Sequence, residues 1–351
     1  MTQQTSRRAP GDAPRSIGVG RRGVLLGGVG FAMAALAGAR GAGAQGSATP
    51  GWPDRPLRLI VPFPGGSTPD LVARTIGGWM APRLGQTVVV ENRVGAGGNI
   101  GTDAVAKATD GHTIGLSING PIATARALYP ALPYDPARDL APLAMAVRAP
   151  QLLVVAPKHA ASVGSVAAFL ALARARPGAL TFASVGAGSG GHLAMVEVMG
   201  QTGTELVHVP YRGFPQAVVD LVGDRVDAMV ATIGAVLPQV RGGQLKALAS
   251  TGESRARELP DLPTMAEAGL PAATSYGWSG LFAPSSMPEA HRARLEALAV
   301  EGFRDPAVRA PLEAAGFEVT GLPAREFATF IARETDRWGG LATRLGLRAD
   351  S

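Results

Sequence analysis

The sequence has 351 residues and no cysteine, which excludes disulfide scaffolds, thiol catalysis and cysteine-ligated zinc sites. Aromatic residues make up only 5% of the chain and charged residues 17%, while 46% of it is hydrophobic, a composition sufficient for an ordinary globular core. The five histidines, at positions 112, 159, 192, 208 and 291, show no metal-ligand spacing, and no GxSxG nucleophile elbow is present. The sequence therefore predicts no metal, no cofactor and no enzymatic activity.

Long apolar runs are also missing. The apolar stretch Val24–Ala37 covers 14 residues, fewer than the 18 or more typical of a transmembrane helix. It follows the pair Arg21-Arg22 and precedes the small residues Ala42-Gly43-Ala44, a pattern typical of a secretory signal peptide. We therefore predict a signal peptide over residues 1–44, through either the general or the twin-arginine export route, and a location in the periplasm. The alternative is an uncleaved N-terminal anchor.

The positive charge is concentrated in the same segment. The net charge of +6 suggests nucleic-acid binding, but residues 1–44 contain six arginines and one acidic residue. The remainder of the chain is close to neutral, which removes the electrostatic basis for binding nucleic acid.

Strand-like and helix-like segments alternate along the rest of the chain. Leu57–Phe63, Thr87–Glu91 and Leu180–Ser184 are apolar runs of strand length, each followed by a stretch of helix length. Such alternation predicts parallel sheets flanked by helices. The C-terminal third is helical by its spacing, over 289–301, 307–315 and 325–345.

Glycine-rich turns follow these three strands. They are Pro64–Asp70, with Thr68 as a candidate N-cap and Pro69 as the first helical residue, Gly95–Gly101 and Ser184–His192. Glycine lets an anion approach the backbone, and the free amides of the following helix point at it. Several charge-assisted hydrogen bonds could hold a carboxylate without an arginine. Tight structural turns remain the alternative for any one of them.

The third turn is also compatible with two enzymatic interpretations. Gly186-x-Gly188-x-x-Gly191 matches the dinucleotide-binding fingerprint, but the next strand ends in Tyr211-Arg212 rather than in the acid that would bind the ribose. Ser189 and His192 could serve as nucleophile and base, although a serine at a helix start is usually a cap.

Longer motifs carry a resemblance to a known family. WPDRPLRLIVPFPGG at 52–66, ENRVGAGGNIG at 91–101, VPYRG at 209–213, LPDLPTMAEAG at 259–269 and WSGLFAP at 278–284 are similar to the Bug family, the TctC-like binding proteins of tripartite tricarboxylate transporters. The resemblance covers essentially the whole chain after the predicted signal peptide.

This resemblance implies an α/β fold of the type II periplasmic binding protein (Venus flytrap) class, with two lobes joined by two crossing strands. We expect lobe 1 over 45–150 plus 275–351, lobe 2 over 151–274, and a small organic carboxylate between them. Membrane permease subunits are the expected partners of a monomeric receptor; a signalling partner or an exported hydrolase are the alternatives. Many members carry an acid where Ala231 or Thr232 stands, so an amino-acid ligand is disfavoured. The expected ligand-binding residues are Phe63, Gly65, Gly66, Ser67, Thr68, Asp70, Asn119, Ser184, Gly186, Gly188, Ser189, Gly190, His192, Tyr211, Arg212, Gly213 and Thr232.

Overall fold

The computed structural model describes residues 51–348; the predicted signal peptide and its cleavage after Ala44 lie outside this range. Ten strands form one continuous sheet with the order β2-β1-β3-β9-β4-β7-β5-β6, and β8 and β10 pair with β4. The strands are β1 (Leu57–Val61), β2 (Val88–Asn92), β3 (Thr113–Ile118), β4 (Leu140–Val155), β5 (Thr181–Ser184), β6 (Val207–Pro210), β7 (Ala228–Thr232), β8 (Lys246–Ser250), β9 (Tyr276–Pro284) and β10 (Glu318–Pro323).

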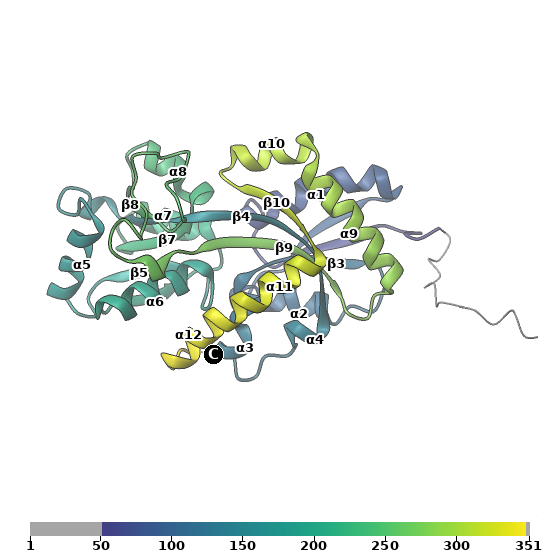
Figure 1. The fold of residues 1–351 in the computed structure, drawn as a ribbon, viewed down its shortest axis with the longest axis horizontal. Helices are drawn as coiled ribbons and strands as arrows, with labels where there is room; N and C mark the ends of the chain where they lie inside the picture. The colour runs from purple at the N-terminus through teal and green to yellow at the C-terminus, as the bar shows by residue number, and fades with distance from the viewer. Residues whose placement is uncertain (1–50, 349–351) are drawn as a thin grey trace, which may run out of the picture. The chain divides into compact units, whose positions relative to one another are not determined.

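Helices cover both faces of this sheet (Figure 1). The α-helices are α1 (Thr68–Leu84), α2 (Asn99–Ala106), α3 (Ala125–Leu128), α4 (Pro136–Asp139), α5 (Val166–Ala175), α6 (Gly190–Thr202), α7 (Phe214–Val222), α8 (Ile233–Arg241), α9 (Glu289–Arg304), α10 (Pro306–Ala314), α11 (Ala324–Glu334) and α12 (Gly340–Arg344). Short 3-10 segments are η1 (Ala96–Gly98), η3 (Pro157–His159) and η4 (Pro271–Ala273), and π-helical segments are η2 (Gly120–Thr124) and η5 (Thr335–Gly339). No helix within 51–348 is both long and apolar enough to cross a membrane.

Two long strands connect two groups of strands. β1 pairs in parallel with β2 and β3, and β5 pairs in parallel with β6 and β7. β4 runs antiparallel to β9 from Leu140 to Pro150 and then pairs with β7 and β8. Figure 1 shows β4 and β9 running between the α5–α8 group and the group that contains α1, α2 and α9. This arrangement confirms the predicted fold class; the lobe boundaries at 150 and 275 stay a prediction.

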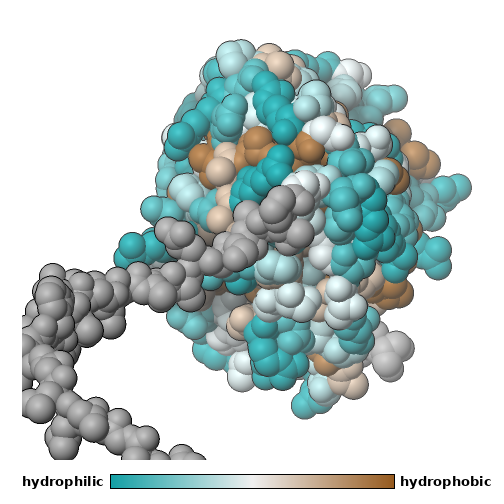
Figure 2. Space-filling model, turned by 90° about the vertical axis from the view of Figure 1, so that its right-hand side faces the viewer, coloured by the Kyte–Doolittle hydropathy of each residue, from teal (hydrophilic) through white to brown (hydrophobic). Residues whose placement is uncertain are grey.

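One core cluster contains residues of both strand groups, such as Leu59 of β1 and Met229 of β7. Leu57, Leu59 and Val61 of β1 are fully buried in this cluster, and Ile60, on the opposite face of the strand, is buried in another, as expected for a parallel strand covered on both faces. A further cluster forms between β5, β7 and helices α5 and α6. At the right-hand end of Figure 1 the outer surface is mainly hydrophilic, with hydrophobic residues in small groups (Figure 2).

The elements differ from the sequence expectations in four places. The helix after β1 begins with Ser67 as its N-cap, one residue before the expected Thr68. The sequence of 141–156 has two apolar runs separated by Arg148-Ala149-Pro150, but they form the single strand β4, which continues through Pro150. The partner of β4 changes at Pro150, because β10 pairs with β4 only as far as Arg148 and the pairing with β7 begins at Gln151. The missing amide hydrogen of Pro150 is therefore tolerated.

Strand β10 was not expected, because it contains a glycine, a proline and a register shift between Val319 and Leu322. The predicted single helix over 325–345 is divided into α11, the π-helical segment η5 and α12. Trp338 and Leu341 of these last segments pack on Leu193 and Val196 of α6. The C-terminal residues, expected in lobe 1, thus also contact the α5–α8 group.

Candidate ligand-binding site

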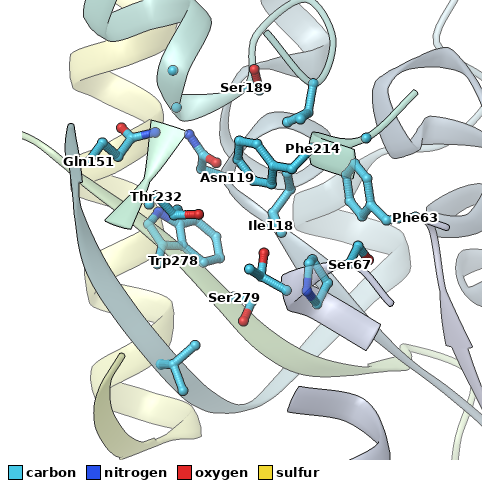
Figure 3. Close-up of a pocket in the computed structure, with 18 of the residues that line it drawn as sticks. Phe63, Ser67, Ile118, Asn119, Gln151, Ser189, Phe214, Thr232, Trp278 and Ser279 are labelled. Carbon is cyan, nitrogen blue, oxygen red and sulfur yellow. The ribbon is translucent and has the colours of Figure 1, made fainter. Parts of the chain in front are cut away.

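A cavity lies where four helices begin. The N-cap residues Ser67 of α1, Ser189 of α6, Gly213 of α7 and Thr232 of α8 all line it. The first amides of a helix have no partner within the helix, and its N-terminus carries a partial positive charge. The four helix starts therefore make this cavity favourable for a negatively charged group. The lining residues, ten of which are labelled in Figure 3, are Phe63, Ser67, Thr68, Pro69, Ile118, Asn119, Val147, Gln151, Val185, Ser189, Gly190, Gly191, Gly213, Phe214, Thr232, Gly277, Trp278, Ser279 and Phe317.

Four buried polar atoms in this cavity have no hydrogen-bond partner among the described residues. They are Ser67 Oγ, Ser189 Oγ, Thr232 Oγ1 and Gln151 Oε1. The four residues are 3%, 3%, 8% and 2% exposed, respectively. None of the three hydroxyls bonds to the helix that it caps. Because buried polar atoms are nearly always paired, such a group around one cavity points to a ligand that supplies the missing partners.

The β1–α1 turn is held in place by a charged cluster. The Asp70 carboxylate accepts hydrogen bonds from the Gly66 amide, Arg74 Nε and Asn92 Nδ2, each at 2.9 Å. Asn92, at the end of β2, also donates to the Phe63 carbonyl oxygen. Burial alone raises the pKa of Asp70, but the bonds from Arg74, Gly66 and Asn92 together hold that pKa below its ordinary value. The ionised Asp70 carboxylate and its partners therefore fix the conformation of the β1–α1 turn.

The β5–α6 turn is held by neutral groups instead. Ser184 Oγ lies 2.6 Å from His208 Nε2 and accepts from the Gly186 amide at 3.1 Å. The Gly188 amide donates to His192 Nδ1 at 3.1 Å, so this nitrogen carries no proton. The two imidazole rings lie 4.2 Å apart.

Both imidazoles are held in their neutral form. Burial, together with the neighbouring His208, lowers the pKa of His192 to about 3. Burial lowers the pKa of His208 to about 4. A desolvated imidazolium is costly, and two rings in contact would repel each other if both were charged. This turn therefore depends on uncharged histidines at neutral pH.

These bonds determine which donors remain for a ligand. The amides of Gly66, Gly186 and Gly188, which were expected to bind the ligand, donate to Asp70, Ser184 and His192 instead. The amides at the start of α1 and α6 belong to residues that line the cavity, such as Thr68 and Gly190. The glycine turns thus position the helix starts, and the cap residues and first-turn residues of these helices line the cavity.

The two sides of the cavity touch each other. Thr124 Oγ1 of η2 donates to the Gly188 carbonyl oxygen at 3.1 Å. A Cβ at Gly186 would lie 2.7 Å from Gly97 Cα, and a Cβ at Gly213 would lie 3.0 Å from Pro64 Cδ. The β5–α6 turn and the β6–α7 turn therefore each meet a segment from the opposite strand group beside the cavity.

The structure brings eight of the seventeen expected residues to this cavity: Phe63, Ser67, Thr68, Asn119, Ser189, Gly190, Gly213 and Thr232. The other nine lie behind it or beside it. Gly65, Gly66, Asp70, Ser184 and Gly188 belong to the two turns and their scaffolds, whereas Gly186, His192, Tyr211 and Arg212 line a separate hollow next to Gly97.

The sequence analysis did not identify most of the apolar residues that line the cavity, nor the side-chain amide of Gln151. Gln151 on β4, Phe214 on α7 and Phe317 before β10 line the cavity, and none of them lies in a glycine-rich turn. Trp278, the first residue of the motif WSGLFAP, lines the cavity as well. A signal existed for Gln151, since it is the one polar residue in the apolar run from Pro150 to Ala156.

The fold and the cavity at the helix starts define a two-lobed solute-binding protein of the periplasmic type. Residues 72–347 match the model of the tripartite tricarboxylate transporter family receptor, TctC, and the chain belongs to this family. It is a family of solute-binding receptors, which confirms the predicted resemblance.

Individual relatives cover most of the chain. The protein BugT of Bordetella pertussis is 38% identical over 299 residues, which are 85% of this chain and 91% of BugT. A solved R. palustris protein with adipate has a TM-score of 0.80 at 33% identity, covering 85% of this chain and 99% of that one. MatC from Rhodopseudomonas palustris, solved with bound malate, has a TM-score of 0.78 at 32% identity, covering 83% and 100%.

Proposed function

We propose that this protein is an extracytoplasmic receptor that binds a small organic carboxylate in the cavity and delivers it to a membrane permease. The observation that carries the proposal is the set of unpartnered buried hydroxyls of Ser67, Ser189 and Thr232 at three helix N-termini. A carboxylate accepts hydrogen bonds from hydroxyls and from free first-turn amides alike, and it is stabilised by the positive ends of the helices.

Two similar proteins support the ligand class. One R. palustris structure was solved with adipate and MatC with malate, and both ligands are organic acids. The contacts between Pro64 and Gly213 and between Gly97 and Gly186 support a mechanism in which two lobes close on the ligand. Closure removes water from the cavity and strengthens each hydrogen bond to the carboxylate. Only the closed form would present a joint surface to the permease.

The alternatives differ in how they use the same cavity. A sensory receptor would bind the same acid and contact a signalling protein, so a partner search in membranes separates it from a transport receptor. A hydrolase would need Ser189 to be activated by a base. Ser189 Oγ has no partner among the described residues, and His192 Nδ1 is occupied by the Gly188 amide, which favours a receptor.

The first prediction is that Ser189→Ala and Ser67→Ala weaken carboxylate binding without destabilising the empty protein. Loss of one hydroxyl bond to a charged ligand costs about 1.5–3 kcal/mol, which corresponds to roughly a tenfold to hundredfold rise in Kd. Because neither hydroxyl has a hydrogen-bond partner within residues 51–348, its removal takes away no bond from that part of the unliganded fold.

Thermal unfolding of the purified protein against a panel of mono-, di- and tricarboxylic acids identifies binders, and calorimetry gives Kd for each variant. Ligand at 100 times its Kd should stabilise the wild type by about 2.7 kcal/mol. Ser254→Ala serves as the control, because Ser254 is exposed and lies outside the cavity. No shift with any carboxylate, or unchanged Kd in both cavity variants, would refute the proposal.

A further inference from the structure

Outside the cavity, one half-buried carboxylate joins two tryptophans. Glu334, the last residue of α11, accepts hydrogen bonds at a single oxygen, Oε2, from Trp278 Nε1 and from Trp338 Nε1, each at 3.0 Å. The two tryptophans are 3% and 2% exposed, respectively, and a buried indole N–H needs an acceptor. Glu334 is not among the residues that line the cavity, so it can act on a ligand only through these partners.

The first of these indoles belongs to the cavity. Trp278 lies on β9 and forms part of the cavity wall (Figure 3). Phe327 and Phe330 of α11 meet its ring edge-to-face, with ring centroids 5.5 and 5.6 Å away. The bond to Glu334 then fixes the direction of the indole N–H. All three contacts come from one helix, so the position of this part of the wall depends on α11.

The second indole leads back to the cavity by another route. Trp338, in η5, packs on Leu193 and Val196 of α6. The same helix begins at the cavity, where Ser189 is its N-cap. A continuous series of contacts therefore runs from the indole of the cavity wall, through the carboxylate and the second indole, to a helix whose start lines the same cavity.

The segment that carries Glu334 also contacts both groups of elements. Phe327 of α11 shares a core cluster with Ile60 of β1, whereas Trp338 shares one with α6. Glu334 lies between these two contacts, at the junction of α11 and η5. Coupling between distant parts of a protein is carried by such packed and hydrogen-bonded series. A movement of one group relative to the other would therefore act on the two indole bonds.

The chemistry of Glu334 shows what a substitution would remove. Burial raises the pKa of Glu334, and the two indole bonds and the charges of Arg337 and Arg333 partly offset this effect. Loss of the acceptor would leave two buried N–H groups unpaired. A glutamine keeps a carbonyl oxygen with two lone pairs, which can accept both bonds without a charge.

We infer that Glu334 is a positioning residue for ligand binding, because its carboxylate couples the Trp278 wall of the cavity to Trp338 and thereby to α6. The inference rests on the proposed function and adds to it a residue that lies outside the cavity. A ligand that displaces the wall indole should change the environment of Trp338. By reciprocity, a variant that breaks this link should bind the ligand more weakly.

The indole N–H signals of the four tryptophans test the coupling by nuclear magnetic resonance. In the isotope-labelled full chain, Trp278→Phe and Trp338→Phe each remove one signal and so assign it. The probe is adipate, malate or, if neither binds, the tightest binder of the acid panel. We expect the probe to shift the signals of Trp278 and Trp338 in the wild type, but only that of Trp278 in Glu334→Leu. An unshifted Trp338 signal in the wild type, or an equal shift in Glu334→Leu, overturns the inference.

Calorimetry with the same probe gives the second measurement. Glu334→Leu should raise Kd about tenfold, which is within the usual range of coupling between two sites, and Glu334→Gln should restore most of the affinity. Asp305→Leu is the matched control, because Asp305 Oδ2 accepts from Trp79 Nε1 at 2.8 Å outside the cavity. This control removes a carboxylate–indole bond of the same kind, so it should move the Trp79 signal and leave Kd unchanged.

Each outcome separates the inference from the proposed function. Equal Kd in the wild type and Glu334→Leu overturns the inference and leaves the proposed function intact. An equal loss in Glu334→Gln also overturns it, because the charge rather than the shared acceptor would then matter. If Glu334→Leu does not fold, Trp338→Phe decides, since it keeps a ring against α6 and removes the N–H; an unchanged Kd there refutes the link. Failure of every carboxylate to bind overturns both proposals.

Discussion

The turns before α1 and α6 both direct a capped helix start at the cavity, but different chemistry holds each of them. Behind the β1–α1 turn, the charged pair Asp70–Arg74 and the Asn92 amide fix the Gly66 amide and the Phe63 carbonyl oxygen. Behind the β5–α6 turn, Ser184 and two uncharged histidines fix the amides of Gly186 and Gly188. The start of α1 is thus positioned by charged groups, whereas the start of α6 is positioned by neutral groups.

The comparison shows that the glycine amides of Gly66, Gly186 and Gly188 are not free to bind an anion in either turn. In both turns the loop amides are used internally, and the freed groups are the cap hydroxyls of Ser67 and Ser189. The glycines permit the close approaches that bring these caps together. Each scaffold can then be perturbed separately, by sterics, by pH or by removal of a charge, and the expected effects differ in size.

The largest effect is expected from steric change in the β5–α6 turn. A Cβ at Gly191 would lie 2.0 Å from the Val230 carbonyl oxygen of β7, and neither backbone can yield without disturbing the sheet. We predict that Gly191→Ala destabilises the protein by at least about 3 kcal/mol, the upper range of overpacking in a core. Gly66→Ala in the other turn meets no atom within 4 Å but has a φ of +75°, so about 1–2 kcal/mol is expected.

Urea unfolding measures both values. Gly78→Ala is the control, since Gly78 lies inside α1 with open space around it, and alanine there should be neutral or stabilising by up to about 1 kcal/mol. Equal costs for Gly191→Ala and Gly66→Ala would show that the two turns are constrained alike and would contradict the steric argument.

An intermediate effect is expected when the pH is lowered by one unit. The folded pKa values of His192 and His208 are about 3 and about 4, below the unfolded value of about 6.5. Between about pH 4 and 6.5 the unfolded chain therefore binds more protons, so stability falls as the pH is lowered through this window. Each histidine contributes a slope of at most about 1.4 kcal/mol per pH unit.

The ionic turn responds in a different window. The pKa of Asp70 is lowered in the fold, so its contribution is present above the unfolded value of about 3.9 and is lost only as the pH falls below it. His208→Gln should flatten the slope of the unfolding free energy between pH 4 and 6.5, and Asp70→Asn should leave that slope unchanged. Urea titrations at four or five pH values check this; the reverse pattern would contradict the assignment.

Much of the fold could be predicted because its signals are local. The apolar runs that became β1 and β5 are short, buried and bounded by turn residues, and the run predicted over Leu180–Ser184 forms β5, Thr181–Ser184. β10 and the passage of β4 through Pro150 depend on partners distant in the sequence. Periodicity within a segment carries no information about such a partner.

The candidate site shows the same contrast between local signals and contacts distant in the sequence. The starts of α1 and α6 could be located, since each follows a strand and a glycine-rich turn, and the resemblance added Asn119 and Thr232. The apolar wall comes from β4, β9 and the segment before β10, where Val147, Trp278 and Phe317 are ordinary core residues by sequence. The sequence also could not predict which hydrogen-bond donors remain free, because this depends on bonds such as that from the Gly188 amide to His192 Nδ1.

The smallest effect is expected from removing the arginine beside each turn. Arg74 donates to Asp70 at 2.9 Å, but its side chain is 54% exposed, so Arg74→Ala should cost about 0.5–1 kcal/mol and raise the ligand Kd only a few-fold. Arg212, near the other turn, is exposed and lines the hollow next to Gly97 rather than the cavity. A charge there is screened by solvent and salt, so Arg212→Ala should change Kd less than twofold in calorimetry at 0.15 M salt. A tenfold loss in Arg212→Ala would mean that a fixed cation, rather than the helix starts, balances the carboxylate, and it would reverse the comparison between the two turns.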